Sequence, residues 1–126
     1  MKKIGVIVIL LSVFFWANIY SGYSQLNQQT KAVDVNKDGK PDVTYHSDGK
    51  YVSKIEADTN YDGKPDVIVN LENGKFKSAQ ADTDYDGKVD KKFGNAKEFD
   101  KWLNEKHPDF KDKLSRTDWQ FNLLNF

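Results

Sequence analysis

Three short stretches of the chain place oxygen-bearing side chains at alternating positions, an arrangement suited to binding a hard metal ion. Each follows the pattern D-x-[DN]-x-D-G-x-x-D, and we name them the first loop (34–42), the middle loop (58–66) and the third loop (82–90). The pattern recurs every 24 residues. Calcium takes roughly six to eight oxygen ligands at about 2.3–2.6 Å, which carboxylates and amides on a tightly curled backbone can supply. We therefore expect up to three calcium ions.

The expected ligands occupy the same positions in each loop. Side chains at positions one, three, five and nine coordinate, together with the backbone carbonyl at position seven, so the lysine side chain there stays solvated. The glycine at position six permits the sharp turn, because it adopts backbone angles that other residues resist. The ligand sets are Asp34, Asn36, Asp38, Lys40 and Asp42; Asp58, Asn60, Asp62, Lys64 and Asp66; and Asp82, Asp84, Asp86, Lys88 and Asp90.

An ordinary turn is the alternative interpretation, because Asp-Gly is also a common hairpin signal. Three copies that keep every ligand position favour a metal site, since the acidic groups of each loop would otherwise repel one another. The pattern resembles EF-hand-type calcium loops, the calcium loops of thrombospondin type 3 repeats and those of FG-GAP repeats in integrin-like propellers. It is also similar to the Asp-rich repeats of many secreted bacterial proteins.

The resemblance covers about residues 31–94 and implies the metal and its ligands, but no architecture and no biological role. Position twelve, where the EF-hand has a bidentate glutamate, is Tyr45, Val69 or Phe93. Thrombospondin repeats carry disulfides, which this cysteine-free chain lacks, and FG-GAP repeats are much longer than 24 residues. Without the glutamate we expect weak binding, with dissociation constants near the roughly 10⁻⁴–10⁻³ M of extracellular modules.

Length and composition indicate one small polar domain. The 126 residues include 30% charged and 38% hydrophobic residues, and the formal net charge is zero. The chain has no arginine cluster or basic patch, so nucleic acid is not an expected partner. The absence of cysteine excludes disulfides, thiolate metal sites and a cysteine nucleophile. A small exported domain without disulfides needs another source of stability, and bound metal can supply it.

The N-terminus has the pattern of an export signal. Lys2 and Lys3 precede a nearly unbroken apolar run over 4–20, and small residues follow before a candidate cleavage point ahead of Gln25. We expect residues 1–24 to be a signal peptide and the protein to be periplasmic or secreted. An uncleaved N-terminal anchor is the alternative. We expect a polar linker over 25–30.

The segments between the loops predict β-hairpins. Short β-prone runs follow the loops at 43–45, 67–69 and 91–93, and the turn signals Asp48-Gly49 and Asn73-Gly74 precede return strands. The expected fold is mainly β, an antiparallel meander of hairpins over 31–94 with the metal loops at one end and the tight turns at the other. The hairpins differ in length by one residue, which predicts a bulge or a different turn length in one of them. The residues expected to share the core face are Val43, Tyr45, Tyr51, Val67, Val69, Phe76 and Phe93.

Residues 95–126 change to a helical pattern. A capping box at 95–98 starts a helix that His107-Pro108 should end, and a second short helix is expected after Pro108. We expect this C-terminal segment to be a helical cap on the sheet, because an isolated meander leaves one face uncovered. The alternative is that its apolar end is an exposed binding patch.

Three classes of function fit these features. We expect a non-enzymatic exported calcium-binding module with a structural, adhesion or interaction role, whose partners are calcium and a cell-surface protein or glycan. A carbohydrate- or protein-binding module, or an inhibitor, would instead use exposed aromatics such as Trp102, Trp119 or Tyr61. A hydrolase is the third class, but only His46 and His107 could act as bases at neutral pH, and neither lies in a recognisable catalytic arrangement. We therefore expect no catalytic residues, and a membrane contact only through a retained N-terminal segment.

Overall fold

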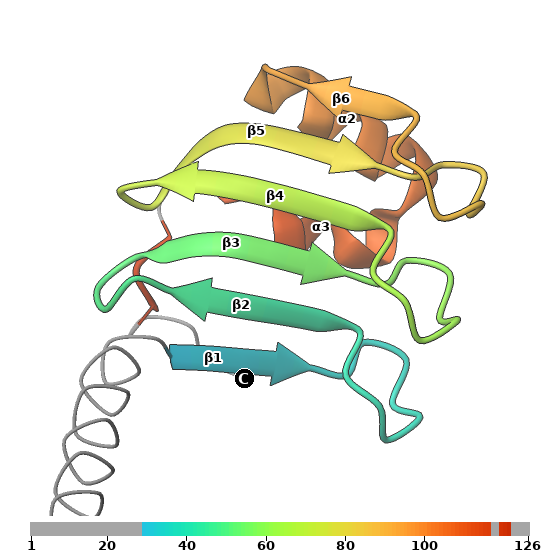
Figure 1. Ribbon diagram of the computed structural model, residues 1–126, viewed down its shortest axis with the longest axis horizontal. Helices are drawn as coiled ribbons and strands as arrows, with labels where there is room; N and C mark the ends of the chain where they lie inside the picture. The colour runs from blue at the N-terminus through green and yellow to red at the C-terminus, as the bar shows by residue number, and fades with distance from the viewer. Residues whose placement is uncertain (1–28, 117–118, 122–126) are drawn as a thin grey trace, which may run out of the picture.

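The computed structural model describes residues 29–116 and 119–121 (Figure 1). The expected signal peptide and residues 25–28 of the expected linker lie outside the described residues. Within the described part of the chain, every helix is too short or too polar to cross a bilayer.

Six strands form one antiparallel sheet in sequence order (Figure 1). The first, middle and third loops join β1 to β2, β3 to β4 and β5 to β6 at one end of the sheet, and tight turns join the remaining pairs at the other end. The expected antiparallel meander is confirmed. The strands are β1 (Gln29–Val33), β2 (Val43–Ser47), β3 (Val52–Ala57), β4 (Val67–Glu72), β5 (Lys75–Ala81) and β6 (Lys91–Phe93).

Strand β1 begins inside the segment for which the sequence predicts a linker. Gln29 and Thr30 pair with β2, so the last two residues of the expected linker 25–30 belong to the sheet. Lys31 takes an inward position, where its ammonium group lies 4.8 Å from the centre of the Phe121 ring and donates to the Phe121 carbonyl at 3.2 Å. A lysine at that position removes the polar–apolar alternation by which a half-buried strand is recognised.

Both hairpins contain a bulge at the same position of the repeat. The extra residue is Ser53 in β3 and Lys77 in β5. The hairpins differ in their turns, which occupy residues 48–51 in the first and 73–74 in the second. A bulge and a difference in turn length are therefore both present. The bulge occurs in both hairpins, and the turn length is what differs between them.

The C-terminal segment covers one face of the sheet (Figure 1) with α2 (Ala96–Lys106), η1 (Pro108–Phe110) and α3 (Lys111–Leu114). Asn95 caps α2 by accepting from the Lys97 N–H at 2.8 Å. The core expected from the sequence is confirmed, except that Phe76 and Tyr51 are only partly buried. The side chains that meet across the two layers, all at most 4% exposed, include Val43, Tyr45, Ile55, Val67, Val69, Phe93, Phe99, Leu103, Phe110, Leu114, Trp119 and Phe121.

Candidate metal-binding loops

The three loops share one backbone conformation. The fourth residue has φ of 62°, 61° and 60° in Lys37, Tyr61 and Tyr85. The glycine at position six has φ of 89°, 88° and 90° in the first, middle and third loops. The left-handed region costs a non-glycine residue roughly 1–2 kcal/mol, so local contacts must hold the fourth residue there.

Hydrogen bonds from backbone N–H groups to the carboxylate and amide side chains of the loop supply those contacts. Asp34 accepts from the N–H groups of Asp38 and Gly39, at 3.2 and 2.7 Å. Asn36 accepts from the Asp38 N–H at 3.1 Å, and Asp38 accepts from the Lys40 N–H at 2.8 Å. The middle and third loops repeat all four bonds, with lengths between 2.7 and 3.3 Å. These bonds draw the side chains at positions one, three and five toward the inside of each loop.

The aspartate at position nine joins the end of each loop to its beginning. Asp42 accepts from the Val35 N–H at 2.7 Å. Asp66 accepts from both the N–H and the hydroxyl of Thr59, at 2.9 and 2.5 Å, and Asp90 has the same two donors in Thr83. The threonines were not among the sequence-predicted site residues, although their recurrence at position two of both loops was a signal.

Carboxylate oxygens converge in two of the three loops. Those of Asp34, Asp38 and Asp42 lie within 4.8 Å of one another, and those of Asp82, Asp84 and Asp86 do the same. Two oxygens bound to one calcium are at most about 5 Å apart, since each bond is about 2.3–2.6 Å long. Both clusters therefore have the dimensions to hold one ion. Within the described residues, the three aspartates of the middle loop do not form such a cluster.

The carboxylates of the loops differ in their electrostatic environment. Burial raises the pKa of Asp66 to about 6, although hydrogen bonds from Thr59 oppose this. A hydrogen bond with the Asp82 carboxyl raises the pKa of Asp84. By contrast, hydrogen bonds from Thr83 lower the pKa of Asp90. Asp66 and Asp84 thus resist ionisation, and a nearby cation would favour their charged forms.

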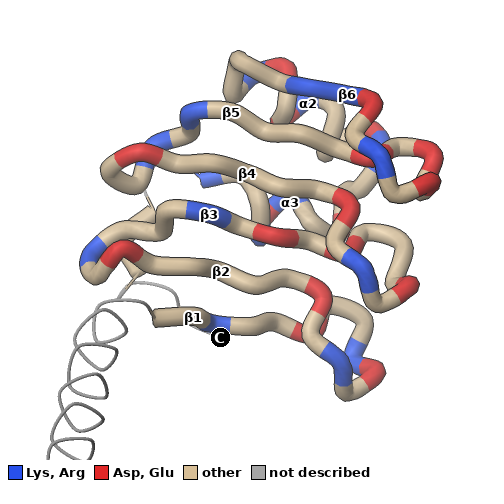
Figure 2. The backbone as a smooth tube through the Cα atoms, viewed as in Figure 1, with Lys and Arg blue, Asp and Glu red and all other residues tan. Residues whose placement is uncertain are grey.

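The predicted ligand at position seven is a backbone carbonyl, and its role stays a prediction. The N–H groups of Lys40, Lys64 and Lys88 each donate to the position-five aspartate at 2.8 Å. Basic and acidic positions alternate along the backbone at the loop end of the sheet (Figure 2). The lysine side chains reduce the net negative charge of each loop without occupying a ligand position.

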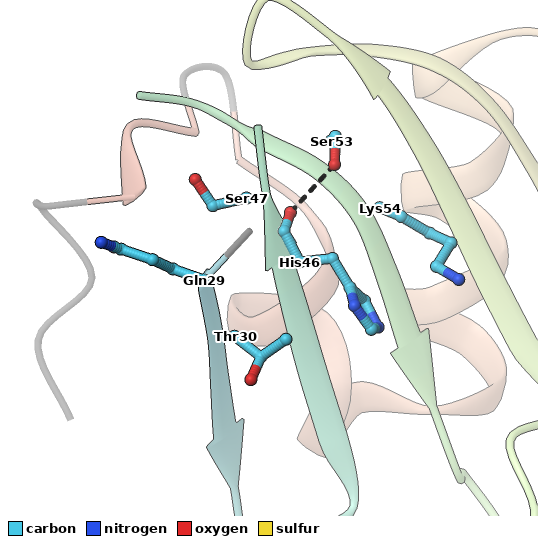
Figure 3. Close-up of a pocket in the computed structure, with 6 residues that line it drawn as sticks. All are labelled: Gln29, Thr30, His46, Ser47, Ser53 and Lys54. Carbon is cyan, nitrogen blue, oxygen red and sulfur yellow. Dashed lines mark hydrogen bonds between the residues drawn. The ribbon is translucent and has the colours of Figure 1, made fainter. Parts of the chain in front are cut away.

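A separate hollow of about 350 Å³ lies beside β1, β2 and β3 (Figure 3). The Ser53 hydroxyl there donates to the His46 backbone carbonyl at 3.2 Å. The His46 Nε2 atom lies 2.8 Å from the carboxylate of Glu56, whose other oxygen is 3.2 Å from the Lys54 ammonium group. Ser53 therefore engages the main chain rather than the imidazole, and the imidazole engages a carboxylate. The hollow is lined by Gln29, Thr30, His46, Ser47, Ser53 and Lys54.

The remaining candidate residues lie in the cap or at the loop tips. Trp119 is buried, at 1% exposed, while Trp102 and His107 are partly buried with ring centres 5.0 Å apart. Tyr61 and Tyr85 are 39% and 42% exposed. The described chain therefore presents its exposed aromatics at the tips of the middle and third loops.

Comparison with known proteins finds no match to the chain among family models, curated proteins or solved structures.

Proposed function

We propose that the protein is a non-enzymatic calcium-binding module, in which up to three ions order the loops at one end of the sheet. The observation that carries the proposal is the repetition of one loop geometry. All three loops have the same left-handed residues at positions four and six and the same inward-directed side chains at positions one, three and five. The carboxylate clusters in the first and third loops support it further.

The donor set favours calcium over magnesium. Side-chain and backbone oxygens on a loop can adapt to calcium, which accepts a variable number of ligands at about 2.3–2.6 Å. Magnesium requires a near-ideal octahedron at about 2.0–2.1 Å and dehydrates reluctantly, so such a loop serves it poorly. The missing position-twelve glutamate makes each site weak, in the range of extracellular modules.

Calcium would stabilise the fold as well as the loops. Each loop carries three or four aspartates, and in the first and third loops three of their carboxylates converge. Protons or a cation would relieve the repulsion between them. An ion that binds the folded state adds RT ln(1 + [L]/Kd) per site, about 1.4 kcal/mol at ten times the dissociation constant. The export pattern of the N-terminal segment supports a site of action where calcium would reach millimolar levels, and we propose a structural, adhesion or interaction role there.

Exposed tyrosines favour one second candidate function. Tyr61 and Tyr85 present rings at the same end of the sheet as the metal loops. They could contact a glycan or a protein at the cell surface, in which case calcium would hold them in position. A glycan-array screen with and without calcium would test this candidate, and Tyr61→Phe and Tyr85→Phe would be the conservative controls.

Calorimetric titration of two matched variants tests the calcium proposal. Asp62→Ala removes a side-chain ligand from the middle loop and should eliminate one of three binding events. Lys64→Ala should bind calcium as the parent does, because only the backbone carbonyl of Lys64 is a proposed ligand. A parent protein that gives no heat at millimolar calcium, or two variants that titrate alike, would contradict the proposal.

A further inference from the structure

The loops contact one another through the main chain. The N–H of Asp58, the first residue of the middle loop, donates to the carbonyl of Asp42, the last residue of the first loop, at 2.8 Å. The N–H of Asp82 donates in the same way to the carbonyl of Asp66, also at 2.8 Å. At both junctions, a proposed ligand residue of one loop is thus bonded to a proposed ligand residue of the next.

In the third loop, the tyrosine at position four borders the middle loop. Tyr85 lines a hollow of about 130 Å³ between the third loop and Asp62 and Asp66 of the middle loop.

The middle loop lies between the other two loops (Figure 1) and also contacts the cap. The ring centres of Tyr61 and Phe110 are 5.8 Å apart, and Phe110 is only 2% exposed. Asp58 and Thr59 are each 7% exposed. The middle loop is therefore bonded to both of its neighbours and also packs against the cap.

Given the calcium sites proposed above, on which this inference rests, we infer that the loops fill cooperatively and that the middle loop couples the first to the third. An ion in one loop fixes its first and ninth residues. Those residues carry the N–H and the carbonyl of the junctions, so the neighbouring loop loses less conformational freedom when it binds its own ion. Couplings of ordinary size change affinity by about 5-fold or more. The first and third loops should be coupled only while the middle loop can bind calcium.

The amides of Gly39, Gly63 and Gly87 provide a separate reporter for each loop, because each donates to the position-one aspartate at 2.7 Å. Their ¹⁵N–¹H shifts are to be followed during calcium titration of the parent and of Asp62→Ala. We expect the calcium concentration at the midpoint of the Gly39 and Gly87 shifts to rise about 5-fold or more in Asp62→Ala. Unchanged midpoints in this variant would overturn the coupling while leaving calcium binding intact. If no glycine amide of the parent responds to calcium, the proposed function itself fails.

A second pair of variants tests the coupling with every ligand in place. Tyr85→Asn removes the ring that borders Asp62 and Asp66 but tolerates the left-handed backbone, and should raise the Gly63 midpoint above its parental value. Tyr85→Phe keeps the ring and should keep the parental midpoints. Core amides such as that of Val69 must retain their parental shifts, which excludes general unfolding as the cause. Equal Gly63 midpoints in Tyr85→Asn and the parent would overturn the role of the ring.

Discussion

The middle and third loops have the same ligand pattern and the same backbone angles, but they lie in different surroundings. In the middle loop, Asp58, Thr59 and Asp66 are at most 9% exposed. By contrast, Thr83 and Asp90 of the third loop are exposed. The position-nine aspartates have equivalent threonine donors, yet burial raises the pKa of Asp66 while hydrogen bonds lower that of Asp90. The repeat therefore sets the loop geometry, whereas packing sets the electrostatic cost of each empty site.

The largest expected effect comes from removing the side chain through which the cap contacts the middle loop. Phe110→Ala should lower the free energy of unfolding by about 3–5 kcal/mol, because it truncates a buried aromatic side chain. It should also raise the calcium midpoint of Gly63 more than that of Gly87, since the Tyr61 ring loses its contact. Chemical denaturation and amide shifts measure the two effects.

A matched control for Phe110 lies at the turn end of the sheet. Phe121 is also 2% exposed, and its N–H donates to the Lys50 carbonyl at 3.0 Å. Phe121→Ala should cost a similar amount of stability without a preferential effect on Gly63. If both variants change the calcium midpoints of the two loops equally, the cap does not act on the middle loop specifically.

The second test compares Asp66→Asn with Asp90→Asn in the presence of a chelator. The pKa of Asp66 is raised from 3.8 to about 6, so the folded state favours its protonated form. The stability gained from this protonation is fully present below pH 3.8 and is lost as the pH rises through about 6. At pH 7, Asp66→Asn should therefore stabilise the metal-free protein by roughly 1–3 kcal/mol.

Asp90→Asn should give no such gain, because the depressed pKa of Asp90 means that its charged form already contributes stability at pH 7. In calcium, each variant should weaken the binding event of its own loop, because an amide oxygen replaces a charged ligand. Thermal or chemical unfolding in chelator measures the first effect. A destabilised Asp66→Asn would show that burial does not penalise this carboxylate.

The third test examines what the two loops have in common. Gly63 and Gly87 have φ of 88° and 90°, and a Cβ at either position would meet nothing within 4 Å. Gly63→Ala and Gly87→Ala should therefore each cost about 1–2 kcal/mol, from backbone strain alone. Unequal losses in chemical denaturation would mean that the loops do not share one backbone conformation.

The smallest expected effect concerns His107, whose ring lies between those of Trp102 and Phe110 in the cap. Burial, followed by the charge of Lys106, lowers its pKa below the ordinary 6.5. The unfolded chain therefore binds more protons near pH 6, so stability falls as the pH is lowered through about 6.5. His107→Gln should flatten this part of the stability profile measured in chelator. A profile identical to the parent's would show that charging His107 has no cost.

The sequence was sufficient to predict the features that depend on local chemistry. Asp-Gly and Asn-Gly turns, alternation around Tyr45 and Val69, and the loop pattern all act over a few residues, and the hairpins and the common loop geometry follow from them. Strand β1 escaped prediction because Lys31 fills an inward position and is stabilised by Phe121, 90 residues away.

The contrast between the loops could not be predicted, because it depends on contacts distant in sequence. Asp66 and Asp90 occupy the same position of the loop pattern, so the pattern alone does not distinguish them. The burial that raises the pKa of Asp66 arises only when the chain folds into the sheet. The threonine donors at position two were visible in the sequence, but their role required the geometry of the folded loop.

The most direct measurement of the central claim is a calcium titration followed by the amide shifts of Gly39, Gly63 and Gly87 in the parent protein. Each amide donates to a proposed ligand of its own loop, so each loop is observed separately. Our account predicts that all three shift at submillimolar to millimolar calcium, that a chelator reverses the shifts, and that magnesium at equal concentration produces much smaller ones. Three glycine amides that remain in place at saturating millimolar calcium would contradict it.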